Sequence, residues 1–272
     1  MPRPIRFNAF SMNAASHQSP GLWRHPRNTS VAFNRLSYWT ELARLLERGL
    51  FDALFIADVL GIYDVYQGSP QAALRGGVQV PVNDPLLLVP AMAGVTEHLG
   101  FGVTFSLTYE HPYPFARRMS TLDHLSNGRV GWNIVTGYLD SAARNLGLAR
   151  QLGHDQRYDL AEEYLQVLYK LWEKSWDDDA VLLERASGRY IEPSRVHPIN
   201  HVGEHFQVPW HAPVPAVAAT HPGVVPGRGV GTRSAVCRTA CRMRVHQRAN
   251  ADGAAPLRRR HPPGLRSGRA WP

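Results

Sequence analysis

Short apolar runs alternate along the chain with longer segments in which apolar residues recur every three or four positions. The short runs predict β-strands that are buried on both faces, as in a parallel sheet. The longer segments predict amphipathic helices, and glycines at positions 49 and 100 are typical helix stops. The predicted strands cover Ile5–Phe10, Phe51–Ala57, Phe101–Leu107 and Val130–Val135. The predicted helices cover Tyr38–Arg48, Pro85–His98, Phe115–Leu125 and Asp155–Lys174.

The order of these elements indicates an α/β fold. Four strand-then-helix units with short returns predict a parallel sheet with right-handed crossovers. Both an open, doubly wound sheet and half of an eight-stranded (β/α)8 barrel fit this order. No Gly-x-Gly-x-x-Gly motif follows any predicted strand, which counts against a dinucleotide-binding sheet. The barrel is therefore favoured, followed by an irregular insertion, Trp176–Pro209, whose end at His205–Val208 reads as a short strand.

The last 62 residues carry all of the chain's excess positive charge. From His211 onward there are 11 Arg, no Lys and one acidic residue, Asp252, so this segment has a formal net charge of +10. The other 210 residues carry 19 basic and 21 acidic residues, for a net charge of −2. The overall charge of +8 is therefore no argument that the folded part of the chain binds nucleic acid.

Two interpretations of this segment remain open. It has no Ile, Phe or Tyr and no regular apolar spacing, so it cannot offset the entropy of ordering, and we expect disorder. It could be a natural basic arm that binds nucleic acid or another polyanion. Its Arg, Pro, Ala and Gly content also suits out-of-frame translation of a GC-rich gene, which we favour because the chain has 28 Arg but only two Lys. We expect a folded domain at residues 1–209 and a non-homologous tail at 210–272.

Polar residues stand at the ends of three predicted strands. Asp58 follows the second strand, Thr104 lies near the end of the third, and Asn133 lies near the end of the fourth. Sites in parallel α/β proteins form where the strands end, so these side chains are candidate ligand contacts. Each has a structural alternative: Asp58 could cap the next turn, and a lone Thr or Asn at a strand end is more often structural.

A second set of candidates lies in helix ends and loops. His154 and Tyr158 are four residues apart at a helix start, so they share a face and could bind a ring or a phosphate; the alternative is an N-terminal cap with Asp155. The remaining candidates follow strands and could line the mouth of a pocket, although each alone is an ordinary surface residue. They are His17, Tyr63, Gln79, His111 and Tyr138.

No nucleophile elbow, phosphate loop or metal-spaced His/Glu pair is present, and Cys237 and Cys241 lack a second ligand pair for zinc. The lack of other catalytic groups suggests that a cofactor carries the reaction. No apolar stretch has the length of a membrane helix and the first eight residues lack the plan of a signal peptide, so a cytoplasmic location is expected.

Several runs resemble one family, the bacterial-luciferase-like, reduced-FMN-dependent monooxygenases, in its nitrilotriacetate, dibenzothiophene-sulfone and long-chain-alkane group. The resemblance covers residues 5 to about 209. Within this range, residues 8–10, 63–66 and 80–85 are most similar to the long-chain alkane enzymes. The matching runs are GLWRH (21–25), FDALFIAD (51–58), TYEHPY (108–113), MSTLDHL (119–125), GWNIVT (131–136), HDQRYD (154–159) and YKLWE (169–173).

The resemblance implies a (β/α)8 barrel that uses FMNH2 from a separate flavin reductase, and O2, to oxygenate a small organic or xenobiotic substrate of the alkane, sulfone or aminopolycarboxylate type. It also implies residue roles by position. Flavin contacts would come from Asp58, Thr104, Asn133, Gly137, His154 and Tyr158. Catalytic residues on the substrate side would be His17, Tyr63 and Tyr138, with Gln79 and His111 as further substrate contacts.

The sequence departs from this family in two respects. The alkane enzymes have Cys at the position of Ala14 and Ser-His at Gly137-Tyr138, so alkane specificity is not expected here. The resemblance also stops after Pro209, which leaves four of the eight barrel strands. The fourth strand would then present an unpaired edge, which a homodimer is one way to cover.

Overall fold

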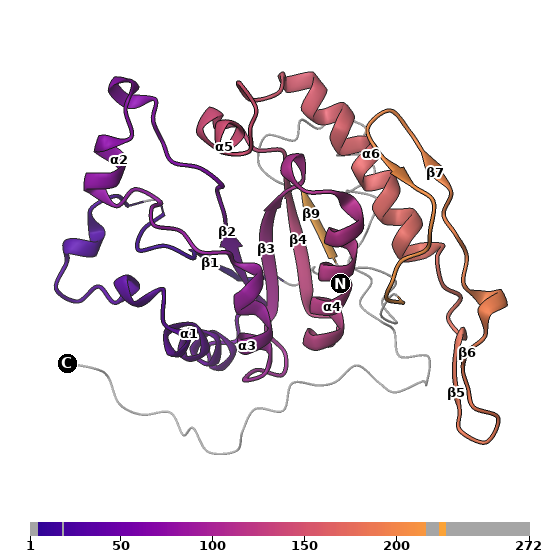
Figure 1. The fold of residues 1–272 in the computed structure, drawn as a ribbon. Helices are drawn as coiled ribbons and strands as arrows, with labels where there is room; N and C mark the ends of the chain where they lie inside the picture. The colour runs from indigo at the N-terminus through magenta and orange to yellow at the C-terminus, as the bar shows by residue number, and fades with distance from the viewer. Residues whose placement is uncertain (1–4, 18, 216–222, 227–272) are drawn as a thin grey trace, which may run out of the picture.

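The computed structural model describes residues 5–17, 19–215 and 223–226, which centre on one parallel sheet (Figure 1). Its strands, in spatial order, are β1 (Asn8–Met12), β2 (Ala53–Ala57), β3 (Gly100–Ser106), β4 (Val130–Val135) and β9 (Gly223–Pro226). All neighbouring pairs are parallel. The four predicted strands are thus confirmed in order and direction, and their carboxyl ends meet at one edge of the sheet.

Four helices pack side by side in the order α1, α3, α4, α6 and cover one face of the sheet (Figure 1). Large apolar side chains of the strands, such as Leu54, Phe101 and Trp132, are fully buried beneath them. On the other face, the ring of Phe10 stacks on that of Phe55 at 5.2 Å, and Phe10 remains 53% exposed. The helices span α1 (Leu36–Arg48), α3 (Val89–Ala93), α4 (Pro112–Ser126) and α6 (His154–Glu173).

The helix predicted at Pro85–His98 is shorter than expected. A 3-10 turn, η4 (Leu86–Leu88), leads into α3, which ends at Ala93. The chain then turns because the Glu47 carboxylate of α1 accepts hydrogen bonds from the backbone N–H groups of residues 97–99. A carboxylate from a distant helix therefore satisfies the donors that a longer helix would have used internally.

The expected unpaired edge of β4 was a wrong prediction, because β9 pairs with it. Gly131 stands opposite Gly223, and Ile134 opposite Pro226. No pattern in the sequence predicted this strand, since residues 223–226 lie in the Arg- and Pro-rich segment. The predictions of disorder, out-of-frame origin and polyanion binding concern residues that lie mostly outside the described part of the chain.

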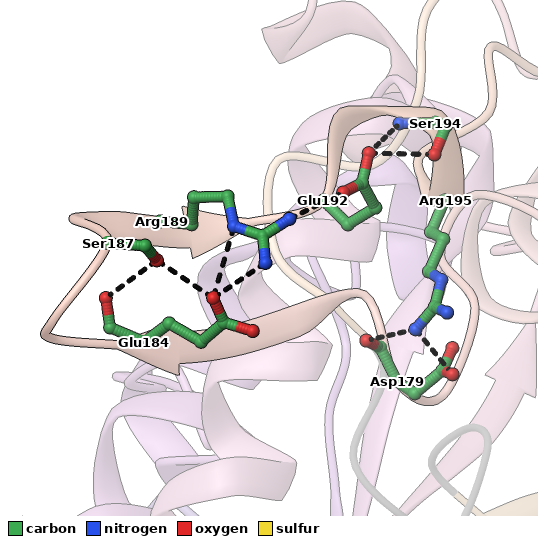
Figure 2. A network of polar contacts seen from close by, with 7 residues as sticks. All are labelled: Asp179, Glu184, Ser187, Arg189, Glu192, Ser194 and Arg195. Carbon is green, nitrogen blue, oxygen red and sulfur yellow. Dashed lines mark hydrogen bonds and ion pairs between the residues drawn. The ribbon is translucent and has the colours of Figure 1, made fainter.

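The insertion after α6 contains two small antiparallel hairpins, where the sequence predicted irregular structure and one short strand. They are β5 (Val181–Glu184) with β6 (Arg189–Ile191), and β7 (His201–Val202) with β8 (Gln207–Val208). The β5–β6 hairpin projects from the body of the molecule (Figure 1). Its own polar contacts hold it, including Arg189 Nη2 to Glu184 Oε2 at 2.7 Å (Figure 2). These groups are exposed, so each contact contributes little stability.

Two short helices stand in the loops that follow strands, and the sequence analysis missed both. They are α2 (Gln71–Gly76), in the long loop after β2, and α5 (Asp140–Asn145), after β4. In the described part of the chain, no helix combines the length and the apolar character needed to cross a membrane.

Candidate active site

A cavity of about 340 Å³ lies where the chain leaves β2, β3 and β4. Its volume is at the small end of the roughly 300–1,000 Å³ range of ligand pockets. The carboxyl end of each strand contributes a polar residue to the wall: Asp58 directly after β2, Ser106 as the last residue of β3, and Thr136 directly after β4. The fourth side is the first turn of α6. The full lining is Asp58, Val59, Leu60, Ser106, Tyr109, Ile134, Val135, Thr136, Gly137, Tyr138, Leu139, Ala142, His154, Arg157 and Tyr158.

The Asp58 carboxyl occupies the β2 side of this cavity in a setting that disfavours its charge. The pKa of Asp58 is raised from 3.8 to about 6, mainly by burial and in part by the negative charge of Asp84, while a hydrogen bond from the Val59 N–H opposes the shift. A carboxyl with a pKa close to neutral can accept or donate a hydrogen bond. Of the three strand-end candidates, Asp58 is the one that lines the cavity.

The turn after β4 is shaped around Gly137. Its backbone has φ +65°, and a Cβ atom there would lie 3.2 Å from Ser106 Oγ and 3.3 Å from Tyr109 Cε2. The side chain of Arg157 donates a hydrogen bond of 2.6 Å from Nη1 to the Gly137 carbonyl. Glycine is needed here both for its left-handed conformation and for the close approach of two cavity side chains.

The first turn of α6 presents two predicted residues to the cavity. The rings of His154 and Tyr158 lie 4.8 Å apart, as their spacing of four residues predicted, and both line the wall. His154 Nδ1 is 2.9 Å from Asp155 Oδ1, but this contact joins two side chains and caps no backbone group; the side chain at the helix start that accepts from the backbone is Gln156, from the Gly153 N–H at 3.1 Å. The N-terminus of this 20-residue helix has a positive partial charge, which favours an anionic ligand group.

Two buried polar atoms at the cavity have no hydrogen-bond partner in the described structure. They are Ser106 Oγ and Arg157 Nε. Leaving such atoms unpaired costs about 1–3 kcal/mol each, so a ligand that supplies partners gains affinity. A planar heterocycle with carbonyl and phosphate oxygens has groups of the right kind for these donors. The residues present therefore fit a flavin cofactor.

Other predicted residues lie near the cavity without lining it. Thr104 and Asn133 are paired across β3 and β4, where Asn133 Nδ2 donates to Thr104 Oγ1 at 2.9 Å; both are buried, two residues before Ser106 and Val135. Their predicted flavin contact stays a prediction.

The predicted substrate-side residues fall into two pairs and one outlier. The Tyr63 hydroxyl forms a hydrogen bond with the hydroxyl of Tyr138, a cavity residue. Gln79 Nε2 donates to the His17 carbonyl at 3.3 Å. His111 stands apart: it caps α4 by accepting from the Tyr113 N–H and lines a separate hollow that ends at Trp210.

The sequence analysis did not single out Ser106, Tyr109 and Arg157 as site residues. Arg157 could have been found, because it lies three residues after His154 and so shares its helix face. Ser106 could also have been found, because it lies two residues after Thr104 and so shares its face of β3. Tyr109 gave no such signal, because it lies in a 3-10 turn after the strand. In the described residues, no group of three or more His, Cys, Asp or Glu side chains could hold a metal ion.

Comparison with known proteins identifies the family. The model of the luciferase-like monooxygenases matches residues 9–232, which extends past the predicted domain boundary at residue 209. The chain belongs to the luciferase-like monooxygenase family. It is 60% identical over 209 residues to a long-chain alkane monooxygenase of Geobacillus thermodenitrificans and 58% identical over 209 residues to a dimethyl-sulfide monooxygenase of Hyphomicrobium sulfonivorans. These matches cover 77% of this chain in both cases.

Solved structures agree with this placement. The crystal structure of a long-chain alkane monooxygenase matches with a TM-score of 0.83 and 55% identity, covering 86% of this chain and 54% of the other. A riboflavin lyase crystallised with modified FMN matches with a TM-score of 0.78 and 35% identity, covering 82% and 50%. The predicted α/β barrel class is confirmed. The chain spans about half the length of the curated relatives it matches, 48% and 44% of the first two.

Proposed function

We propose that this chain forms the cofactor-binding part of a flavin-dependent monooxygenase. Such an enzyme would use FMN reduced by a separate flavin reductase, and O2, to oxygenate a small organic substrate. Family membership supports this reaction class, and the names of the relatives indicate weakly polar substrates, an alkane and a sulfide. The bound reduced flavin would supply the electrons that activate O2, and the protein would hold the ring and exclude water.

One observation carries the proposal. Around a single cavity, the chain gathers the Asp58 carboxyl, the unpaired Ser106 Oγ and Arg157 Nε, and the positive end of α6. Donors that already lack partners suit the carbonyl and phosphate oxygens of a flavin. His154 and Tyr158 would contact the same ligand from the first turn of α6, and Thr104 and Asn133 would support it from the strands below.

The substrate side would be formed by Tyr63, Tyr138 and His17, with Gln79 behind them. Burial, together with the Tyr63 hydroxyl, raises the pKa of Tyr138, so its phenol stays protonated and can donate a hydrogen bond. Burial also lowers the pKa of His17, so its imidazole is neutral around pH 7. A wall of neutral groups suits an uncharged substrate better than an anionic one.

The test is flavin binding by the full 272-residue chain, measured by fluorescence titration with FMN and, under anaerobic conditions, with reduced FMN. We expect micromolar affinity. Arg157→Gln removes the donor at the cavity and should weaken binding about tenfold or more, because charged hydrogen bonds contribute about 1.5–3 kcal/mol. Arg185→Gln makes the same chemical change at an exposed position of the β5–β6 hairpin and should leave the affinity unchanged. No flavin binding, or equal affinities for both variants, would refute the proposal.

A further inference from the structure

Four consecutive residues after β2, Gly61–Asp64, are fastened to the segment that follows β4. A Cβ atom on Gly61 would lie 2.8 Å from Ser141 Oγ and 3.0 Å from the Ala142 backbone nitrogen, so the two chains are in direct contact. The Ser141 hydroxyl satisfies both backbone groups of Ile62: it donates to the carbonyl at 2.7 Å and accepts from the N–H at 3.2 Å. One side chain thus replaces a pair of backbone hydrogen bonds.

The next two residues extend this contact. The hydroxyl of Tyr63 bonds to that of Tyr138, and the Asp64 carboxylate forms an ion pair with Arg144. All of these partners are separated by 75–80 positions in sequence, so tertiary structure alone brings them together. We refer to residues 61–64 as the strap.

The sheet order places the strap across the cavity. β3 lies between β2 and β4, so a bridge from the β2 exit to the β4 exit passes over the carboxyl end of β3. Ser106 and Tyr109, which follow β3, line the cavity there. Val59 and Leu60 lead into the strap and also line the cavity, as do Tyr138 and Leu139 on the other side. The strap therefore joins the walls of the cavity that lie on either side of β3.

The chemistry of the fastening allows it to open. It consists of one hydroxyl, one phenol pair and one ion pair, with no strand ladder between the two segments. All four strap residues are partly exposed, and the neighbouring Leu60 and Tyr138 are 52% and 60% exposed, so none of the strap is locked into the core. Segments with few buried apolar contacts and partly exposed hydrogen bonds open at low free-energy cost compared with core strands.

We propose that residues 61–64 form an access strap over the cavity, and that ligands enter and leave it when the contacts to Ser141, Tyr138 and Arg144 release. The inference rests on the proposed function only in its choice of FMN as the probe. If the strap opens equally readily with and without ligand, a substitution that makes it open more often raises the association and dissociation rate constants by the same factor. A residue that contacts the ligand acts mainly on dissociation.

The experiment compares stopped-flow FMN binding for the full chain and for the variants Ser141→Ala and Arg144→Gln, neither of which is assigned a ligand contact. Ser141→Ala removes two hydrogen bonds and Arg144→Gln removes an ion pair, so each should raise both rate constants by about two- to tenfold while Kd stays constant. Ser187→Ala, which removes a hydroxyl bonded to Glu184 Oε2 at 2.8 Å in the β5–β6 hairpin (Figure 2), should change neither. A rise in dissociation alone, or no change in either constant, overturns the strap.

If the chain binds no flavin, the proposed function is refuted but the strap is not. Hydrogen exchange then tests the strap without a ligand. The Ile62 amide should be protected in the unmodified chain through its bond to Ser141. Ser141→Ala should accelerate exchange in residues 61–64 and leave β3 unchanged. If residues 61–64 already exchange as fast as the exposed turn at 185–188, the strap is refuted independently of any ligand.

Discussion

Replacing Asp58 by Asn should make the protein's stability less sensitive to pH. The folded-state pKa of about 6 lies above the ordinary value of 3.8, mainly because of burial. Well below pH 3.8 the carboxyl is protonated in both states and costs nothing. As the pH rises towards 6, the unfolded chain loses this proton while the folded chain keeps it, so the folded state loses stability; above 6 the full cost is present.

The magnitude follows from the two pKa values. Their difference corresponds to about 3 kcal/mol if the site were dry. Solvent reaches the cavity beside Asp58, so we expect a smaller figure of about 1–3 kcal/mol. Asn keeps the shape and the acceptor for the Val59 N–H but cannot ionise. The stability of Asp58→Asn relative to the unmodified chain should therefore rise by this amount between pH 4 and pH 7.

Urea unfolding at a series of pH values from 4 to 8 measures this difference. Subtracting the unfolding free energy of the unmodified chain from that of the variant cancels the titration of the other groups. The change of this difference with pH is free of any pH-independent effect of the substitution. Asp178→Asn, the same change at an exposed position, is the control and should follow the unmodified chain. If the curves for Asp58→Asn and the unmodified chain run parallel, the carboxyl is not held in the environment described here.

Two further substitutions test the packing of the fold, one at the cavity and one at the opposite end of the sheet. Gly137→Ala should destabilise the fold by about 1 kcal/mol because of its left-handed backbone, and by more because the new Cβ crowds Ser106. Gly188→Ala, at φ +70° with open space around it, should show only the backbone cost. The urea midpoints of the two variants measure the difference. Arg129→Gln should destabilise the fold by about 3 kcal/mol, because the guanidinium donates to backbone carbonyls of three segments at 2.8–3.1 Å. Thermal unfolding measures this, with Arg185→Gln as the control, and equal melting temperatures for the two variants would contradict the prediction.

Local regularities in the sequence were enough to predict the strands, most helices and some of the residues that line the cavity. β4 was predicted to the residue, because its apolar run is bounded by turn residues on both sides. His154 and Tyr158 were predicted to share a face, and their rings do lie together. Asp58 was found because the carboxyl ends of parallel strands meet at one edge. In each case the information lies within a few neighbouring residues, where backbone geometry alone fixes side-chain direction.

Only the tertiary structure decided the contacts that join distant segments. The capping of residues 97–99 by Glu47, the bond from Arg157 to the Gly137 carbonyl and the pairing of Tyr63 with Tyr138 leave no periodic trace in the sequence. The strand that covers the edge of β4 is a further case. Such contacts depend on which loops the folded sheet brings together, because each is made by single side chains or short backbone stretches whose partners lie 20 to 90 residues away.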